Sequence, residues 1–283
     1  MGYKEIYNEW LTNAYFDADT KAELERIASD ENEIKERFYT DLEFGTAGLR
    51  GIIGAGTNRM NIYTVRKATQ GLANYILKSG NAEKGVAIAF DSRRMSPEFA
   101  QEAACCLAAN GIKAYVFDSL RPTPELSYAV RKLGCIAGIN ITASHNPPEY
   151  NGYKVYWEDG AQITPPHDKG IMDEVKAVTD YTTMKTMPAE DAKAAGIYEV
   201  IGAEVDDAYI AELKKQVIHQ DAIDAVGKEL KIVYSPLHGT GNIPARRILK
   251  ELGFENVYVV CRTANSRLFL IRIRRRQRHL NWD

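Results

Sequence analysis

Short apolar segments alternate with helical segments along this chain, and this alternation limits the folds that it can adopt. Residues 85–90, 112–117 and 135–141 are apolar runs that predict strands. The patterns between them predict helices of about 10–15 residues. Strands separated in this way favour parallel βαβ units, with helices on both faces of the sheet.

Capping residues mark the expected ends of these helices. Ser96 and Thr123 each precede a proline, a pattern typical of a helix N-terminus, so both are expected to be N-caps. Gly111 and Gly134 are expected to end the same two helices. Amphipathic patterns predict one or two helices in residues 17–38, another in 61–78, and a hairpin made of residues 153–157 and 161–164.

A second block with the same alternation begins near Val205. It comprises a helix to about His219, a strand 230–234, a glycine-rich turn, a helix to Leu252 and a strand 254–260. Residues 185–202 are expected to connect the two blocks. One βαβ unit cannot cover both faces of its sheet, so an incomplete second domain is predicted. The expected domains are therefore 1–204 and 205–260, followed by a tail, 261–283.

Composition excludes several classes of protein. With 283 residues and 45% hydrophobic content, the chain can form one to two domains. Its apolar runs are too short to cross a membrane, and its N-terminus lacks the apolar core of a signal peptide. The four cysteines (Cys105, Cys106, Cys135 and Cys261) have no metal-binding spacing. These features favour a protein of the reducing cytoplasm.

The tail differs in charge from the rest of the chain. Residues 261–283 contain seven arginines and one acidic residue, a net charge of +6, whereas 1–260 carry 29 basic and 37 acidic residues, a net charge of −8. One interpretation is an arm that binds nucleic acid or an anionic surface. We favour the alternative that the tail is a frameshifted or artefactual end.

One loop contains residue types suited to chemistry. Residues 142–148 read Thr-Ala-Ser-His-Asn-Pro-Pro, directly after an apolar run, and Lys154 follows in Asn-Gly-Tyr-Lys. The two prolines prevent an ordinary helix, so the Ser144 hydroxyl is expected on a stiff turn. Serine, asparagine and proline are also common turn residues, so the pattern alone leaves a purely structural turn open.

This loop resembles the phosphoserine loop of the α-D-phosphohexomutases, the phosphoglucomutase and phosphomannomutase superfamily. Residues 43–51, Glu-Phe-Gly-Thr-Ala-Gly-Leu-Arg-Gly, resemble the N-terminal signature of that family, and Ala47 favours its phosphoglucomutase and phosphopentomutase branch. Residues 234–241, Tyr-Ser-Pro-Leu-His-Gly-Thr-Gly, resemble the start of its second domain. The resemblance covers residues from about 40 to 260. It implies a mixed, mostly parallel sheet sandwiched by helices, plus an incomplete second α/β domain.

The resemblance also implies roles for individual residues. Ser144 would carry the phosphoryl group, and Lys154 would be the general acid or base, its pKa lowered by burial and by neighbouring positive charge. Arg50 would contact the active-site phosphate. Arg93, Arg94, Asn146 and His238 are candidates for binding phosphate or substrate, and a purely structural role for the pair Arg93 and Arg94 remains the alternative.

His145 is expected to position phosphate or sugar oxygens and is included among the catalytic candidates. Successive side chains of an extended segment point in opposite directions. We therefore do not expect His145 to activate the Ser144 hydroxyl directly. A histidine that only shapes the loop remains the alternative.

Several elements of the family are missing from this sequence. It lacks the Asp-Gly-Asp-x-Asp-Arg loop that binds Mg²⁺, the glutamate-containing sugar-binding loop and the Arg-x-Ser-Gly-Thr phosphate clamp. Ser144 could supply one oxygen to a metal, too little to hold Mg²⁺ alone. The resemblance implies Mg²⁺ and a sugar 1,6-bisphosphate activator, yet this chain is expected to be inactive or nearly so by itself.

Three functions remain as hypotheses. The leading one is phosphoglucomutase-like transfer between the 1- and 6-positions of a sugar phosphate, with no membrane or nucleic-acid partner expected. A second enzyme hypothesis changes the substrate to a pentose phosphate or the product to a sugar bisphosphate. The third is a non-catalytic module that binds phosphate or polyanions through the basic tail. A serine hydrolase is disfavoured, because no Gly-x-Ser-x-Gly motif surrounds Ser144.

Overall fold

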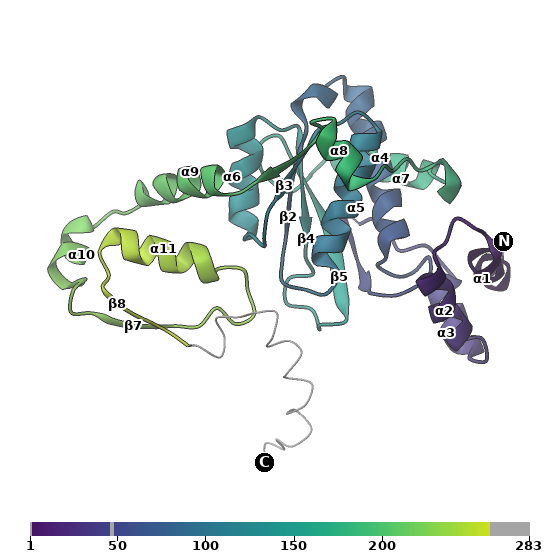
Figure 1. Ribbon diagram of the computed structural model, residues 1–283, viewed down its shortest axis with the longest axis horizontal. Helices are drawn as coiled ribbons and strands as arrows, with labels where there is room; N and C mark the ends of the chain where they lie inside the picture. Colours follow the sequence, from purple (N-terminus) through teal and green to yellow (C-terminus); the bar gives the residue numbers. More distant parts are fainter. Residues whose placement is uncertain (1, 46–47, 261–283) are drawn as a thin grey trace, which may run out of the picture.

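The computed structural model describes residues 2–45 and 48–260, and its centre is a six-stranded sheet (Figure 1). The strand order is β1-β5-β4-β2-β3-β6. Neighbours among β4, β2, β3 and β6 are parallel, whereas β5 is antiparallel to both β4 and β1. This confirms the mixed, mostly parallel sheet. The strands are β1 (Gly48–Ile52), β2 (Val86–Phe90), β3 (Ala114–Phe117), β4 (Ala137–Ile141), β5 (Tyr150–Trp157) and β6 (Tyr198–Ile201).

Helices cover both faces of this sheet, as the sequence predicts (Figure 1). Alternate residues of β2 point to opposite faces, so Val86 and Ile88 join one buried cluster while Ala87 and Ala89 join another. The first cluster contains residues of α4, α5, α7 and α8, and the second contains residues of α6 and α9. These helices are α4 (Ile62–Ser79), α5 (Ser96–Ala109), α6 (Thr123–Leu133), α7 (His167–Ala177), α8 (Ala189–Ala194) and α9 (Ala203–Lys214).

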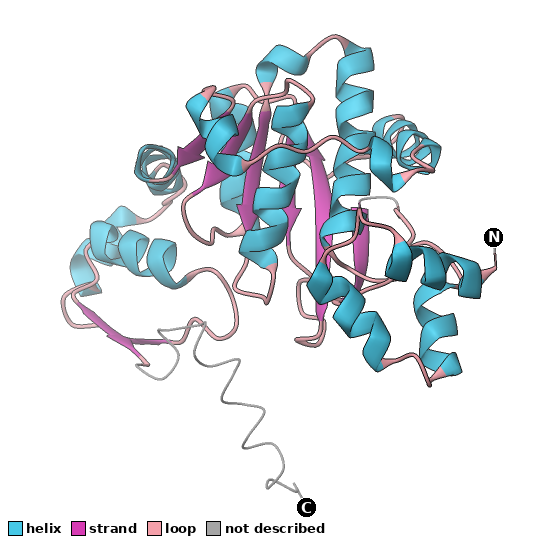
Figure 2. Cartoon of the chain, turned by 45° about the vertical axis from the view of Figure 1, so that its right-hand side comes forward, coloured by secondary structure: helices cyan, strands magenta, loops and turns pink. Residues whose placement is uncertain are grey.

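Three short helices form a further layer near the N-terminus (Figure 2). They are α1 (Tyr3–Thr12), α2 (Ala18–Arg26) and α3 (Glu31–Phe38). Residues 17–38 therefore form two helices, because the side chains of Asp17 and Asp30 each cap a separate N-terminus. Trp10 is the centre of this layer: its ring stacks on Phe16 at 4.2 Å. Sequence patterns did not predict α1.

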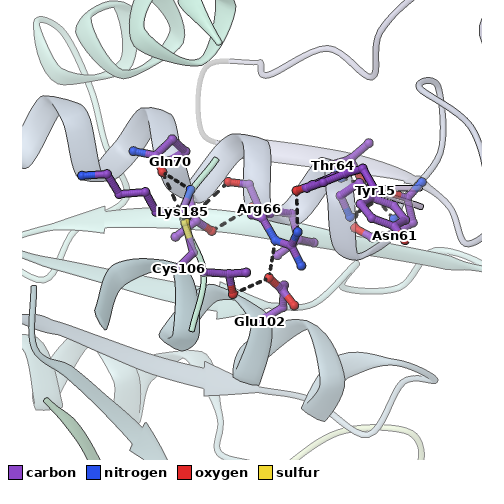
Figure 3. Close-up of polar contacts among 12 residues, drawn as sticks. Tyr15, Asn61, Thr64, Arg66, Gln70, Glu102, Cys106 and Lys185 are labelled. Carbon is purple, nitrogen blue, oxygen red and sulfur yellow. Dashed lines mark hydrogen bonds and ion pairs between the residues drawn. The ribbon is translucent and has the colours of Figure 1, made fainter. Parts of the chain in front are cut away.

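A buried polar network fixes the N-terminal layer and α5 against α4 (Figure 3). The Arg66 guanidinium of α4 donates to Glu102 of α5 at 2.6 Å and also contacts the Tyr15 hydroxyl. One turn further along α4, the Gln70 amide exchanges two 3.0 Å hydrogen bonds with Asn110. Since each buried polar group requires a partner, this network allows few alternative arrangements of the helices.

Both expected N-caps are wrong by one residue. The N-cap of α5 is Met95, in a left-handed conformation (φ 64°), and the Ser96 hydroxyl donates to Asp91 instead. The N-cap of α6 is Pro122, and the Thr123 hydroxyl accepts a hydrogen bond from Asn140. In both cases another side chain engages the hydroxyl, a nearby one for Ser96 and one from β4 for Thr123. Gly134 ends α6 in a left-handed conformation, as expected, and Gly111 follows the end of α5.

The predicted hairpin of 153–157 and 161–164 forms only in part. Residues 161–164 are not a strand, but an antiparallel bridge joins Gln162 to Tyr156, and two backbone hydrogen bonds link 155–157 to 161–163. The prediction for the next segment is wrong. The segment 185–202, expected to be a connection, contains α8 and β6. Strand β6 extends the sheet by pairing with β3. Its buried positions do not alternate, which leaves little periodic signal in the sequence.

The second block forms the predicted βαβ unit, with its own parallel sheet (Figure 2). Its elements are α10 (Gln220–Val226), β7 (Lys231–Tyr234), α11 (Asn242–Leu252) and β8 (Asn256–Val259). Val233 and Tyr258 remain 75% and 53% exposed, as expected for one unit that cannot cover its sheet. Helix α9 packs on both α6 and α11 and so joins the two blocks. The predictions about the tail, 261–283, lie outside the described residues.

Candidate active site around Ser144

The loop between β4 and β5 presents Ser144 to solvent on a strained turn. Ser144 has a left-handed backbone, with φ of 54°, which costs about 1–2 kcal/mol for a non-glycine residue. The Thr142 hydroxyl accepts a hydrogen bond from the Ser144 N–H at 3.0 Å and stabilises the turn. The Ser144 side chain is exposed, although the strand before it is buried throughout.

The geometric argument against direct activation of Ser144 by His145 does not hold in the structure. Nδ1 of His145 lies 3.2 Å from Oγ of Ser144, within hydrogen-bonding distance. The prediction assumed an extended backbone, in which successive side chains diverge. The left-handed turn at Ser144 places the two side chains together instead. His145 can therefore exchange a hydrogen bond with the hydroxyl, whose direction depends on the imidazole tautomer.

Arg50 approaches the same loop from β1. Its Nη1 donates to Oδ1 of Asn146 at 3.0 Å. Arg50 lies opposite Gly152 of β5, and a Cβ atom at Gly152 would lie 2.6 Å from the Thr142 carbonyl oxygen and 2.9 Å from that of Leu49. Glycine is therefore required for β5 to fit between the loop and β1. The structure thus brings Arg50, Asn146 and Ser144 together.

Lys154 lies two residues beyond Gly152, on the same face of β5 as Gly152. It is half-buried, and burial together with the positive charge of Arg50 lowers the pKa of the Lys154 amine. These are the two causes that the sequence-based expectation named. A lowered pKa increases the fraction of neutral amine that can accept a proton near neutral pH.

A cleft of about 710 Å³ adjoins Arg50 and Lys154. Side chains that sequence reasoning did not single out line it as well, including Asp41, Glu43, Asn58 and Gln162. Asp41 and Glu43 belong to one segment, just before and at the start of the 43–51 motif, whereas Asn58 and Gln162 come from two other parts of the chain. Carboxylate and amide groups of this kind can hydrogen-bond the hydroxyls of a polar ligand.

Arg93 and Arg94 have different environments. The Arg93 guanidinium donates to four backbone carbonyl groups of the Ser144 loop, those of Ser144, Asn146, Pro147 and Tyr150, at 2.7–3.1 Å. The Arg94 side chain is exposed. Their predicted binding of phosphate stays a prediction, although the contacts of Arg93 favour a different role.

His238 belongs to the other sheet. It is exposed and lies in the loop between β7 and α11. Its assignment as a substrate-binding residue also stays a prediction.

The described residues do not by themselves fit a Mg²⁺ ion. Within 2–45 and 48–260, the structure contains no group of three or more His, Cys, Asp or Glu side chains that could hold a metal. Mg²⁺ prefers an octahedral shell of oxygen ligands, and Ser144 could supply only one of them. In the same part of the chain, no helix is both long enough and apolar enough to span a bilayer.

Comparison with known proteins gives the family. Residues 41–182 match the family described as phosphoglucomutase/phosphomannomutase, alpha/beta/alpha domain I. A probable phosphoribomutase of Schizosaccharomyces pombe is 40% identical over 84% of this chain and 40% of the relative. A phosphoglucomutase of Staphylococcus haemolyticus is 36% identical over 92% of this chain and 44% of the relative. The chain therefore spans about two fifths of the length of these relatives.

A solved structure supports the same relationship. The putative phosphomannomutase of Thermus thermophilus superimposes with a TM-score of 0.65 and 26% identity, over 81% of this chain and 48% of that protein. The match includes most of this chain, whose sheet is mostly parallel and flanked by helices. By its matched domain, its relatives and its fold, the chain belongs to the phosphoglucomutase/phosphomannomutase family of isomerases.

Proposed function

We propose that this chain contains the phosphate-carrying part of a sugar phosphomutase that acts between the 1- and 6-positions, and that Ser144 carries the phosphate. The observation that carries this proposal is the grouping of four side chains. An exposed serine hydroxyl lies on a turn that Arg50 reaches through Asn146, and Lys154, an amine of lowered pKa, lies on the next strand. A phosphorylated serine there would have nearby cations to offset its charge.

The proposed transfer conserves atoms and protons. A sugar hydroxyl attacks the phosphorus of phosphoserine 144, so that a new O–P bond forms and the bond from Oγ to phosphorus breaks. The neutral Lys154 amine takes the proton of the attacking hydroxyl. The Ser144 oxygen takes up a proton as it leaves, and in this proposal protonated His145, whose Nδ1 lies 3.2 Å away, supplies it. Arg50 stabilises the negative charge on the transferred group.

We also propose the domain limits 1–204, 205–260 and 261–283, and a dependence on Mg²⁺ and a sugar 1,6-bisphosphate activator. The described residues provide one oxygen for Mg²⁺ at Ser144 and no other grouped ligands. Multiple turnovers by this chain alone are therefore expected to be slow. Transfer of a single phosphoryl group to Ser144 is the step that its own residues support best.

The test is phosphorylation of the chain. Purified chain is incubated with glucose 1,6-bisphosphate and Mg²⁺, and the phosphorylated residue is identified by fragmentation mass spectrometry. We expect phosphate at Ser144, none in Ser144→Ala, and at least about 100-fold slower labelling in Lys154→Met. Labelling at another residue, or equal labelling of Ser144→Ala, would contradict the proposal.

A pentose substrate is the second candidate, because a probable phosphoribomutase is among the similar relatives. The same assay with ribose 1,5-bisphosphate compares the two donors directly. Faster labelling by the pentose bisphosphate would favour this candidate, and faster labelling by the hexose bisphosphate would favour the first.

A further inference from the structure

We propose that Arg93 is a positioning residue, which holds the Ser144 loop in its reactive shape through the backbone and does not bind the substrate phosphate. This inference rests on the proposed function, since it explains how the phosphate-carrying serine is held. It also replaces the role that the sequence suggests for Arg93. Its test requires no turnover, so the two proposals can fail separately.

The hydrogen bonds of Arg93 use the donors that a phosphate would need. A guanidinium has four terminal N–H groups. Nη1 donates to the carbonyl groups of Pro147 (2.9 Å) and Tyr150 (3.1 Å). Nη2 donates to those of Ser144 (2.8 Å) and Asn146 (2.7 Å). Four acceptors therefore match the four terminal donors, and a phosphate could reach these terminal N–H groups only by displacing loop carbonyls.

Arg93 is itself firmly anchored at the end of β2. The carboxylate of Asp91 accepts hydrogen bonds from the Arg93 N–H at 2.9 Å and from the Ser96 hydroxyl at 2.8 Å, and Nε of Arg93 lies 3.4 Å from its other oxygen. On the other side, the Asn151 amide of β5 donates to the Ser96 hydroxyl at 2.9 Å. The anchor thus joins β2, α5 and β5. The Arg93 side chain is only 11% exposed.

The two turns that Arg93 connects are the strained ones. Among the described residues, Met95 and Ser144 are the two non-glycine residues with positive φ. Such conformations persist where surrounding contacts determine them. The Ser144 carbonyl is one of the four acceptors of Arg93, so Arg93 holds the backbone of the residue that carries the hydroxyl. Without the four hydrogen bonds of Arg93, we expect Ser144 to relax toward an extended backbone and Asn146 to lose its alignment with Arg50.

A lysine at this position distinguishes the two roles. Lysine keeps the positive charge but has no planar fork that can reach four carbonyl groups. If Arg93 served mainly as a cation for phosphate, Arg93→Lys would leave the ionisation of the phosphate largely unchanged. If Arg93 holds the loop, Arg93→Lys loses protection of the loop amides nearly as fully as Arg93→Gln.

The experiment uses the chain with phosphoserine incorporated at residue 144. Hydrogen exchange measures protection of the amides in residues 143–152, and ³¹P NMR follows the second ionisation of the phosphate. The variants are Arg93→Lys and Arg93→Gln, each with and without Arg50→Gln. Arg131→Gln is the matched control, because Arg131 is exposed and donates to a single carbonyl, that of Ser127. Protection of β2 and β4 verifies that each variant is folded.

We expect both Arg93 variants to speed exchange in the loop by roughly tenfold or more, the effect of losing a charge-assisted hydrogen bond. We also expect Arg50→Gln to shift the phosphate ionisation when Arg93 is present and to have little effect in Arg93→Lys. The control, Arg131→Gln, should show the same loop protection and the same phosphate ionisation as the unaltered chain. Arg93→Lys that keeps both loop protection and the Arg50 effect would overturn the proposal. A phosphate signal changed by Arg93→Gln but restored by Arg93→Lys, at unchanged loop protection, would also overturn it.

Discussion

Ser144 combines an exposed hydroxyl with a backbone that most residues avoid, and single neighbouring atoms determine that geometry. The Thr142 hydroxyl holds its N–H, and Arg93 holds its carbonyl oxygen. The sequence motif predicted the stiff turn and the grouping of Ser144 with Arg50. It could not predict the contact with His145, because that contact depends on the sign of one φ angle. Nor could it predict the cleft residues Asp41 and Gln162, which tertiary folding alone brings together.

At the residue scale, Gly152→Ala should destabilise the fold. The new Cβ atom would lie within 3 Å of two backbone carbonyl oxygens, which cannot move aside as a flexible side chain can. We expect a loss of about 3 kcal/mol or more in the free energy of unfolding, measured by urea denaturation. Gly80→Ala is the control, since it meets no atom within 4 Å and adds only the strain of a left-handed alanine, about 1–2 kcal/mol. Equal losses in the two variants would contradict this steric explanation.

Lys154 provides a second prediction at this scale. Because Arg50 helps to lower the pKa of Lys154, Arg50→Gln should raise that pKa toward the ordinary value for lysine, about 10.4. Labelling from the bisphosphate is the reverse of the proposed transfer, so Lys154 then gives its proton to the leaving sugar oxygen. A higher pKa keeps the amine protonated to higher pH, so the loss of Ser144 labelling at high pH should shift to higher pH as well. Carbon-13 NMR of the labelled lysine side chain measures the pKa directly. An unchanged titration of Lys154 in Arg50→Gln would exclude this electrostatic coupling.

At the scale of elements, a buried carboxyl lies where α6 meets α9. Glu125 is 1% exposed, and one of its oxygens has no hydrogen-bond partner among the described residues. Burial, followed by a hydrogen bond with Asp206 and the charge of Asp206, raises the pKa of Glu125 to about 8, while the positive charges of Arg121 and Arg247 oppose the shift. Arg121 also donates to both oxygens of Asp206, at 2.7 and 2.8 Å. The packing of α6 against α9 is therefore most favourable when Glu125 is protonated.

This arrangement predicts a pH-dependent stability. A carboxyl whose pKa is higher in the folded state contributes most below the unfolded value of 4.5, and its contribution is lost as the pH rises to about 8. Glu125→Gln should remove this loss and increase the free energy of unfolding at pH 8.5, by on the order of 1 kcal/mol or more. Thermal unfolding of the unaltered chain and of Glu125→Gln, measured from pH 5 to 9, tests this prediction. Parallel pH profiles would show that Glu125 does not titrate in this range.

The sequence predicted helices and strands best where they are long and periodic. The alternation of β2, α5, β3, α6 and β4 was readable because each segment combines a regular apolar pattern with glycine or proline at its ends. Strand β6 was not readable, since it has four residues without regular alternation and forms by pairing with β3. Ser96 and Thr123 were misassigned as caps because other side chains engage their hydroxyls: Asp91, in the loop before α5, and Asn140, in β4.

At the scale of the whole molecule, the first block contains the large buried clusters, whereas the βαβ unit is thinly covered. Its exposed apolar residues include Val233 and Ile243, 75% and 63% exposed. The core that holds Ser144 is thus formed by β1 to β6 and the helices α4 to α9 packed on them. The chain spans about two fifths of the length of its relatives. The residues that surround the βαβ unit in those proteins therefore do not bear on the stability of this core.

Removal of residues 261–283 should therefore leave the first block unchanged. Since its core is formed within residues 2–260, we expect the midpoint of thermal unfolding to change by less than about 2 °C. Differential scanning calorimetry of the shortened and unaltered chains provides the comparison. A large fall in the midpoint of the first block would show that the arginine-rich segment contributes to its folding.

The most direct test of Ser144 as a phosphate carrier is the return of its phosphate to a sugar. Chain phosphorylated at Ser144 is isolated and mixed with glucose 1-phosphate and Mg²⁺, and ³¹P NMR follows where the phosphoryl group goes in a single turnover. We predict that glucose 1,6-bisphosphate appears as phosphoserine disappears. Phosphoserine 144 that persists unchanged, or that yields only inorganic phosphate whether or not the sugar is present, would contradict the account.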